Sequence, residues 1–240
     1  MTAIYLIRHG QASFGKADYD QLSDKGIKQA QLLGNYWQFM PVPNKIYSGN
    51  LLRHQQTLKH FLLAYPSNMP AASLHKGFNE LDHLDLLACY DAKWKDFAKM
   101  TSNLAQQATG DHQLKKIFFC ALERWISQQH NSDYKETWCQ FKQRCVGALQ
   151  DVINITLADK QLSETNQQAQ NICIFTSAGT ISVIVQHILG ISDEKVLALN
   201  LNLRNTSVTK LVFSGNNVNI DYFNNYSHLT TASGDWLTFR

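Results

Sequence analysis

The stretch AIYLIRHG at residues 3–10 is the segment that decides the fold. Its first five residues are almost continuously apolar, as is typical of a strand buried on both faces of a parallel sheet. The apolar run ends at Arg8, His9 and Gly10. Because ligands of open α/β sheets bind outside the carboxyl ends of the strands, these three residues are the first candidates for a functional site.

The three residue types at this strand end suit phosphate chemistry. An arginine has a planar fork of donors that matches phosphate oxygens, and a neutral imidazole can act as a nucleophile. A glycine lets the backbone approach an anion closely. The pattern therefore indicates phosphoryl transfer. Three residues alone also fit a structural role, with Arg8 in a surface ion pair and His9 packed beneath a loop.

Patterns of helix and strand alternate after the first strand. Ser23 is a candidate N-cap for a helix whose apolar residues repeat at helical spacing from Ile27 to Trp37, and Pro41 ends that helix. A short strand at 45–48 and a second helical run over 51–62 follow. This alternation predicts an α/β fold, a three-layer α/β/α sandwich with a mostly parallel sheet.

The alternation is lost at 85–155, where aromatic residues are scattered among polar ones. We expect one domain over 1–240, with 85–155 as a helical cap insertion divided at 109–111. The aromatic residues fit two roles. They can form the core of the cap, or they can line the entrance to the site and select an apolar leaving group.

The last third of the chain returns to the α/β pattern. Residues 160–171 are polar and predict a surface loop, and 172–176 predict a buried strand. A helix is expected beyond Gly179 and ends at Gly190. Apolar runs at 206–213 and 218–223 around a Ser-Gly-Asn-Asn turn predict a hairpin.

Five ordered segments resemble the histidine phosphatase superfamily, which includes the phosphoglycerate mutases. They are LIRHG at 6–10, LSDKG followed by QA at 22–30, IYSGNLLR followed by Thr57, FNEL at 78–81, and NTS at 205–207 with SHL at 227–229. The resemblance covers most of the chain and implies a phosphoglycerate mutase-like fold.

The resemblance also implies roles for single residues. His9 would attack phosphorus and become a transient phosphohistidine, while Arg8 and Arg53 stabilise the phosphoryl charge. Glu80 would be the general acid for the leaving alcohol and then the base for water. The other substrate-binding residues expected on this basis are Gly10, Gln11, Ser13, Ser177 and Ala178. Because the arginines supply the positive charge, we assign no metal and no cofactor.

One segment departs from the family pattern. Where the family has a second histidine in a segment like H-G-G-x-I, this chain has Ser177 at the start of S-A-G-T-I. A serine can donate to a phosphate oxygen but brings no charge, and a hydrogen bond to a charged group is worth about 1.5–3 kcal/mol. The expected loss in rate is on the order of ten- to a few-hundredfold. In the first loop, Ala12 and Gly15 also depart from the pattern.

Four further histidines are given no part in catalysis. His54 and His83 are expected to be partly exposed surface residues, and His187 lies too far along its helix to bind the phosphate. His228 is expected to make a structural hydrogen bond. We assign no metal site to the run Asp82–Asp85, because no second cluster of ligands accompanies it.

Composition limits the partners and the compartment. The chain has 240 residues, 22 Lys and Arg against 19 Asp and Glu, and a net charge of +3. With no basic cluster, neither nucleic acid nor a membrane surface is expected as a partner. The five scattered cysteines predict mostly buried, reduced thiols. The apolar N-terminus meets Arg8 too soon for a secretory signal, so we expect a cytoplasmic protein; a homodimer stays open.

Three functions are consistent with these features. The first is a phosphomonoesterase that acts through a phosphohistidine on a small phosphorylated metabolite. The second is a phosphoglycerate mutase, against which the missing second histidine argues. The third is a catalytically impaired protein of the same fold that binds a phosphorylated ligand or a partner.

Overall fold

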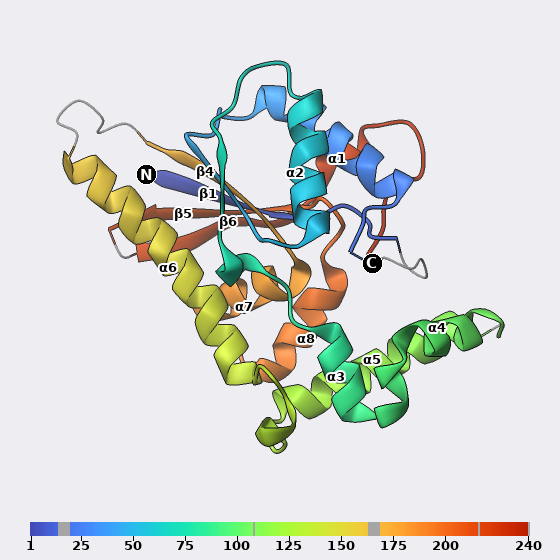
Figure 1. The fold of residues 1–240 in the computed structure, drawn as a ribbon. Helices are drawn as coiled ribbons and strands as arrows, with labels where there is room; N and C mark the ends of the chain where they lie inside the picture. The colour runs from blue at the N-terminus through green and yellow to red at the C-terminus, as the bar shows by residue number, and fades with distance from the viewer. Residues whose placement is uncertain (14–19, 108, 163–168, 216, 240) are drawn as a thin grey trace. The chain divides into compact units, whose positions relative to one another are not determined.

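The computed structural model describes residues 1–13, 20–107, 109–162, 169–215 and 217–239. Within these ranges the central element is a six-stranded sheet with the order β3-β2-β4-β1-β5-β6 (Figure 1). Its strands are β1 (Thr2–Arg8), β2 (Lys45–Ser48), β3 (Ala72–Leu74), β4 (Asn171–Thr176), β5 (Val208–Ser214) and β6 (Asn217–Asn225).

The sheet is mixed, and its larger part is parallel as predicted. Strands β3, β2, β4 and β1 run parallel to one another, while β5 and β6 form the antiparallel hairpin at the other edge. In the register of β1 and β4, Arg8 lies opposite Thr176. The carboxyl ends of these neighbouring strands therefore place His9 and Ser177 side by side.

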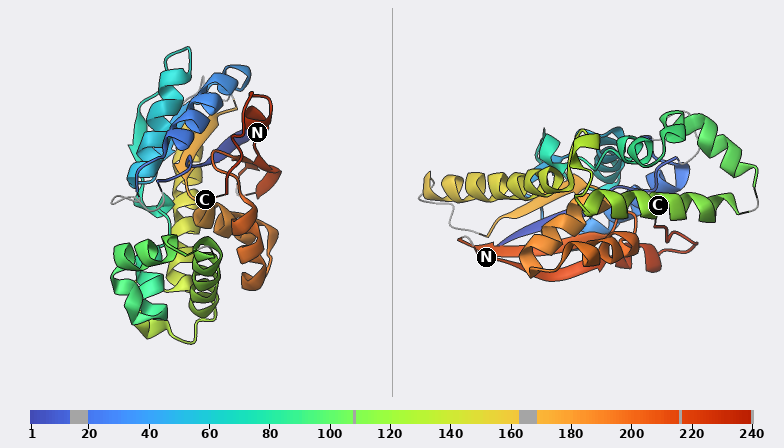
Figure 2. Two further views of the ribbon diagram at one scale, coloured as in Figure 1. Left: turned by 90° about the vertical axis from the view of Figure 1, so that its right-hand side faces the viewer. Right: turned by 90° about the horizontal axis from the view of Figure 1, so that it is seen from below.

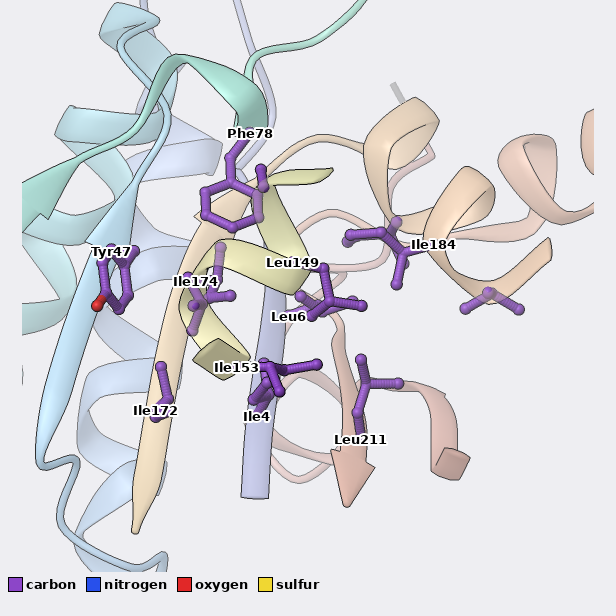
Figure 3. Close-up of a cluster of buried hydrophobic side chains, with 14 of the residues drawn as sticks. Ile4, Leu6, Tyr47, Phe78, Leu149, Ile153, Ile172, Ile174, Ile184 and Leu211 are labelled. Carbon is purple, nitrogen blue, oxygen red and sulfur yellow. The ribbon is translucent and has the colours of Figure 1, made fainter. Parts of the chain in front are cut away.

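Helices cover both faces of the sheet, which gives the predicted three layers. Alternate β1 residues point to opposite faces, as expected of a buried strand. Tyr5 and Ile7 pack in one buried cluster with side chains of α1 (Asp24–Tyr36) and α2 (Leu52–Ala64). On the other face, Figure 3 shows a second cluster in which strand residues meet α6 (Trp138–Leu162) and α7 (Ala178–Leu189); it includes Ile4, Leu6, Ile172, Ile174, Leu149, Ile153 and Ile184.

Helices α1 and α2 lie side by side over the sheet (Figure 2). The Ser23 side chain accepts a hydrogen bond from the Gly26 amide, so it caps α1 as predicted. Gly34 is needed at the contact, because a Cβ there would lie 2.3 Å from the carbonyl oxygen of Phe61 on α2. The later part of α1 therefore packs closely against the last turn of α2.

Residues 81–143 form a second compact unit. It contains α3 (His83–Tyr90), α4 (Phe97–Ala105), α5 (Gly110–Ile126) and the start of α6. Thr109 is the N-cap of α5, in agreement with the predicted break at 109–111. The rings of Trp94, Trp125, Trp138 and Phe141 are buried, which favours the core role for these aromatic residues. The boundaries 85–155 stay a prediction, although α6 continues unbroken through residue 155.

Several elements differ from the sequence expectations. The predicted loop at 160–171 begins later, because α6 extends to Leu162, and 163–168 lie outside the described residues. Helix α7 begins at Ala178, before Gly179. Elements not anticipated are β3, α8 (Asp193–Asn202), α9 (Ser227–Thr230) and short 3₁₀ helices at Trp37–Phe39, Lys76–Phe78, Ala92–Lys95 and Asn131–Asp133.

Two further expectations concern side chains and membranes. All five cysteines are free thiols, but only Cys145 and Cys173 are buried, so the expectation of mostly buried thiols was wrong. In the described part of the chain, no helix combines the length and apolarity needed to cross a membrane.

Candidate active site

His9 is buried immediately after β1, and its backbone is held on both sides. Its amide donates to the Thr176 carbonyl at 2.9 Å, which continues the pairing of β1 with β4. Its own carbonyl accepts from the Thr206 amide and from Asn205 Nδ2, both at 3.2 Å. Thr206 has a φ of 58°, a left-handed conformation that is uncommon for a β-branched residue. The segment at 205–207, matched on the sequence alone, thus fixes the His9 backbone.

The imidazole of His9 is held in one tautomer. Its Nδ1 lies 2.7 Å from the carbonyl oxygen of Gly10, and a carbonyl only accepts, so Nδ1 carries the proton. Burial lowers the pKa of His9 well below 6.5, and the charges of Arg53 and Arg8 lower it further. At neutral pH the ring is therefore uncharged, with its lone pair on Nε2. This is the form that a nucleophilic histidine requires.

The loop after His9 is packed against helices α1 and α2. The Gly10 amide donates to Thr57 Oγ1 at 3.0 Å, and the Gln11 amide donates to Gln29 Oε1 at 2.9 Å. A Cβ at Gly10 would lie 2.5 Å from the Gly26 carbonyl oxygen, so this position needs glycine for close packing against α1. Close packing is therefore a second reason for glycine at position 10, besides the close approach of an anion that the sequence predicts.

Two other expected binding residues in this loop also have fixed positions. The Gln11 side chain accepts from the Ser23 hydroxyl at 3.0 Å. Ser13 is buried, and its amide donates to the Gln21 carbonyl at 2.7 Å. Gln11 is thereby tied to the start of α1.

Both predicted arginines are buried, and both raise the positive potential at His9. Arg8 is buried, not on the surface as in the structural alternative, and its guanidinium donates to the carbonyls of Leu203 and Phe239. Arg53 lies in the first turn of α2 and pairs with Asp20 at 2.6 Å. The other Asp20 oxygen accepts from the Leu52 amide at 2.7 Å, so one carboxylate holds Arg53 and caps α2.

Glu80 lies at the N-terminus of α7. Its Oε2 accepts from the Gly179 amide at 3.1 Å. The preceding residue, Asn79, is held from two directions: its carbonyl accepts from Thr180 Oγ1, and its Oδ1 accepts from the Asn50 amide. These contacts bring the segment at 78–81 to the same end of the sheet as β2 and α7. Ala178 is buried here as the first residue of α7.

His54 was wrongly predicted to be a surface residue. It is 0% exposed, and its Nε2 lies 2.6 Å from the hydroxyl of Ser177, which is also 0% exposed. The centroid of its ring is 5.7 Å from that of His9. The sequence held a signal for this burial, since His54, Leu58 and Phe61 share one helical stripe with spacings of four and three residues.

The other three histidines with an expected place agree with it. His83 is partly exposed and His187 is exposed on α7. His228 is buried, and its Nε2 lies 2.9 Å from Thr206 Oγ1. That hydroxyl donates its proton to the Asn205 carbonyl, so His228 Nε2 is the donor to Thr206. The structural hydrogen bond predicted for His228 is present.

The fold and this cluster define an α/β protein of the phosphoglycerate mutase type, with a buried histidine whose pKa is lowered by the charges of two buried arginines. Residues 4–226 match the model of the histidine phosphatase superfamily (branch 1). The chain therefore belongs to the histidine phosphatase superfamily.

Solved structures of this family share the fold at low sequence identity. A phosphoserine phosphatase from Entamoeba histolytica is 17% identical, with 95% of this chain and 100% of that chain covered and a TM-score of 0.61. A phosphoglycerate mutase from Bacillus anthracis is 18% identical, with 95% and 94% covered and a TM-score of 0.62. YhfR from Bacillus stearothermophilus is 16% identical, with 95% and 99% covered and a TM-score of 0.67. Comparison with curated proteins finds no significant match.

Proposed function

We propose that this protein is a phosphomonoesterase that acts on a small phosphorylated metabolite through a phosphohistidine at His9. The observation that carries the proposal is the hydrogen bond of His9 Nδ1 to the Gly10 carbonyl at 2.7 Å. It fixes the tautomer whose Nε2 can attack phosphorus. Arg8 and Arg53 bring positive charge to the same ring, which suits a group that receives a phosphoryl dianion.

The reaction takes two steps in this proposal. In the first, His9 Nε2 forms a bond to phosphorus while the bond from phosphorus to the alkoxide oxygen breaks, and Glu80 gives its proton to the leaving alcohol. In the second, Glu80 takes a proton from water, the water oxygen bonds to phosphorus, and the N–P bond breaks to release phosphate. Arg8 and Arg53 stabilise the phosphoryl oxygens in both steps.

The substrate-binding residues complete the phosphoryl site. The backbone of Gly10 and the side chains of Gln11 and Ser13 would line one side of it. Ala178 and Ser177 would line another, at the N-terminus of α7, where backbone N–H groups favour an anion. In this proposal Ser177 stands in the place of the family's second histidine and is a weaker, uncharged donor.

The test is turnover together with trapping of the phosphoenzyme. The purified protein is incubated with p-nitrophenyl phosphate and a panel of natural phosphate esters, and labelled protein is trapped as an acid-labile, base-stable adduct. We expect label at His9, and loss of both label and turnover in His9→Ala. His187→Ala removes an exposed histidine of α7 and is the matched control. A folded protein that neither turns over an ester nor labels at His9 would overturn the proposal.

The same proteins separate the two alternatives. A phosphoglycerate mutase would convert phosphoglycerate isomers in a coupled assay with added bisphosphoglycerate. A binding protein without catalysis would show the same negligible turnover in wild type and His9→Ala.

The expected partner is the small phosphorylated substrate, and a homodimer stays open. The five free thiols fit a reducing compartment, so a cytoplasmic location is part of the proposal.

A further inference from the structure

Ser177 occupies the N-cap position of α7 but does not cap the helix. A serine at this position ordinarily accepts from the amide of the second or third helical residue. Here the Gly179 amide donates to Glu80 instead. Within the described residues, the Ser177 hydroxyl has one hydrogen-bond partner, His54 Nε2 at 2.6 Å.

The proton on this contact can be assigned from the other nitrogen of His54. Nδ1 is buried and has no hydrogen-bond partner among the described residues. If Ser177 donated to Nε2, the neutral ring would carry its proton on Nδ1, which would leave a buried N–H without an acceptor. Orphaned buried N–H groups are rare and costly. His54 Nε2–H therefore donates to Ser177 Oγ, and the Ser177 proton is available to another acceptor.

The pair lies beside the nucleophile. His9 and Ser177 directly follow the paired ends of β1 and β4, and the His9 amide donates to the Thr176 carbonyl at 2.9 Å. The ring centroids of His54 and His9 are 5.7 Å apart. From this position the Ser177 hydroxyl can donate its hydrogen bond to a phosphoryl group bound at His9.

We propose that His54 is a positioning residue that, together with Ser177, takes the place of the family's second histidine: Nε2–H of His54 orients the Ser177 hydroxyl so that it donates to a phosphoryl oxygen. The imidazole thus comes from the first turn of α2 instead of from the end of β4. The inference rests on the proposed function for its substrate, a phosphate ester attacked by His9.

The surroundings of His54 are built for this ring. A Cβ at Gly49 would lie 2.3 Å from His54 Nδ1, so glycine makes the room for the imidazole. Burial and the charge of Arg53 lower the pKa of His54 well below 6.5, which keeps the ring neutral. The donor to the phosphoryl group is then a neutral hydroxyl polarised by a neutral ring.

Because of this contact, His54 and a second histidine at position 177 cannot be accommodated together. Ser177 and His54 are each 0% exposed and 2.6 Å apart, so a histidine at 177 has no space while His54 is present. Ser177→His alone should therefore lower activity through overpacking. The double variant H54A/S177H removes the obstructing ring and should be more active than either H54A or S177H.

The main test is a double-mutant cycle on H54A, S177A and H54A/S177A. We measure kcat and KM for p-nitrophenyl phosphate and the inhibition constant of vanadate, a mimic of the phosphoryl transition state. Each single variant should lower kcat and vanadate affinity about tenfold or more, with a much smaller change in KM, and the double variant should lose no more than one single variant. H54Q retains an N–H donor and should recover part of the loss. S182A removes another buried serine of α7, whose hydroxyl donates to the Ala178 carbonyl, and should stay at the wild-type level.

The outcomes distinguish this inference from the proposed function. If H54A matches wild type in kcat and vanadate affinity, or if the two losses multiply, the inference is wrong while the phosphatase stands. If wild type shows no turnover and no label, the phosphatase proposal fails. The cycle is then measured as vanadate and phosphate affinity by calorimetry, with the same non-additive loss expected. A wild-type protein that binds neither ion overturns both. If H54A does not fold, His54→Leu fills the space without a donor, and H54L, S177A and H54L/S177A complete the cycle.

Discussion

Thr57 makes a buried bridge between helix α2 and the loop that begins at His9. It is 0% exposed, and its hydroxyl accepts from the Gly10 amide at 3.0 Å while it donates to the Arg53 carbonyl at 2.6 Å. Thr57→Val keeps the shape of the side chain and removes the hydroxyl. The Gly10 amide is then left without its acceptor.

The expected loss in the free energy of unfolding follows from the groups that lose a hydrogen-bond partner. An unsatisfied buried donor costs about 1–3 kcal/mol, whereas the Arg53 carbonyl lies within α2 and keeps its helical hydrogen bond. Thr156→Val is the matched control, because the buried Thr156 hydroxyl also donates to a helical carbonyl, that of Val152, at 2.7 Å. It accepts no hydrogen bond from a loop amide in the described structure. The two variants therefore differ by the bond to Gly10.

Urea unfolding followed by circular dichroism measures the difference. The free energy of unfolding should fall by about 1–3 kcal/mol more in T57V than in T156V. Turnover should also fall in T57V alone, because the Gly10 carbonyl holds Nδ1 of His9. Equal unfolding free energies for the two variants, within about 0.5 kcal/mol, would refute the reasoning.

Three further predictions address acid stability, helix capping and the C-terminal segment. Burial lowers the pKa of His228 to about 3, so the unfolded chain binds more protons below pH 6.5 and stability falls as the pH falls; His228→Gln should remove about 2 kcal/mol of the loss in unfolding free energy between pH 7.5 and 5. An unchanged pH slope in that variant contradicts this. Asp20→Ala loses both the cap on α2 and the pair with Arg53, and Asp20→Asn, which keeps an acceptor for the Leu52 amide, should be more stable than Asp20→Ala by the capping part, about 0.5–2 kcal/mol; equal unfolding free energies for Asp20→Ala and Asp20→Asn contradict the capping role. Deleting 234–240 removes the Phe239 carbonyl that accepts from Arg8 and the Thr238 groups that hold Asn205, so vanadate inhibition should weaken about tenfold or more; unchanged inhibition with an intact circular dichroism spectrum contradicts it.

Local patterns were sufficient for the elements that carry the site. The apolar run before Arg8 predicted β1, and Ser23 with its apolar repeat predicted α1; both predictions are confirmed. Such patterns succeed because a strand buried on both faces and a capped amphipathic helix each leave a regular local signal. The carboxyl end of β1 as the place of the candidate site followed from the same reasoning.

Contacts between distant segments left no such signal. Asp20 caps a helix that begins 32 residues later, and nothing in the polar stretch around it indicates that partner. Arg8 is held by the main-chain carbonyls of Leu203 and Phe239, and a carbonyl is present at every residue. Sequence patterns of side chains cannot reveal hydrogen bonds that use only backbone groups of the partner.

His54 is an intermediate case, since its burial was readable but its role was not. The stripe shared with Leu58 and Phe61 places it toward the sheet. The residue that it meets there, Ser177, is 123 positions away. Only the parallel pairing of β2 and β4 brings the first turn of α2 and the start of α7 together.

The absence of histidine at position 177 therefore cannot be weighed by itself. Within the proposed function, Ser177 judged alone brings no charge to the phosphoryl site and indicates a weakened enzyme. Judged with its contact, it is one half of a buried pair whose other half is an imidazole on α2, and Gly49 supplies the space for that ring. Any one of the three positions changed alone leaves a clash or an unpaired polar group, so we expect their effects on the proposed catalysis to be coupled. The loss in rate caused by the serine then depends on how strongly the Nε2–H group of His54 polarises the Ser177 hydroxyl. The double-mutant cycle measures this dependence directly.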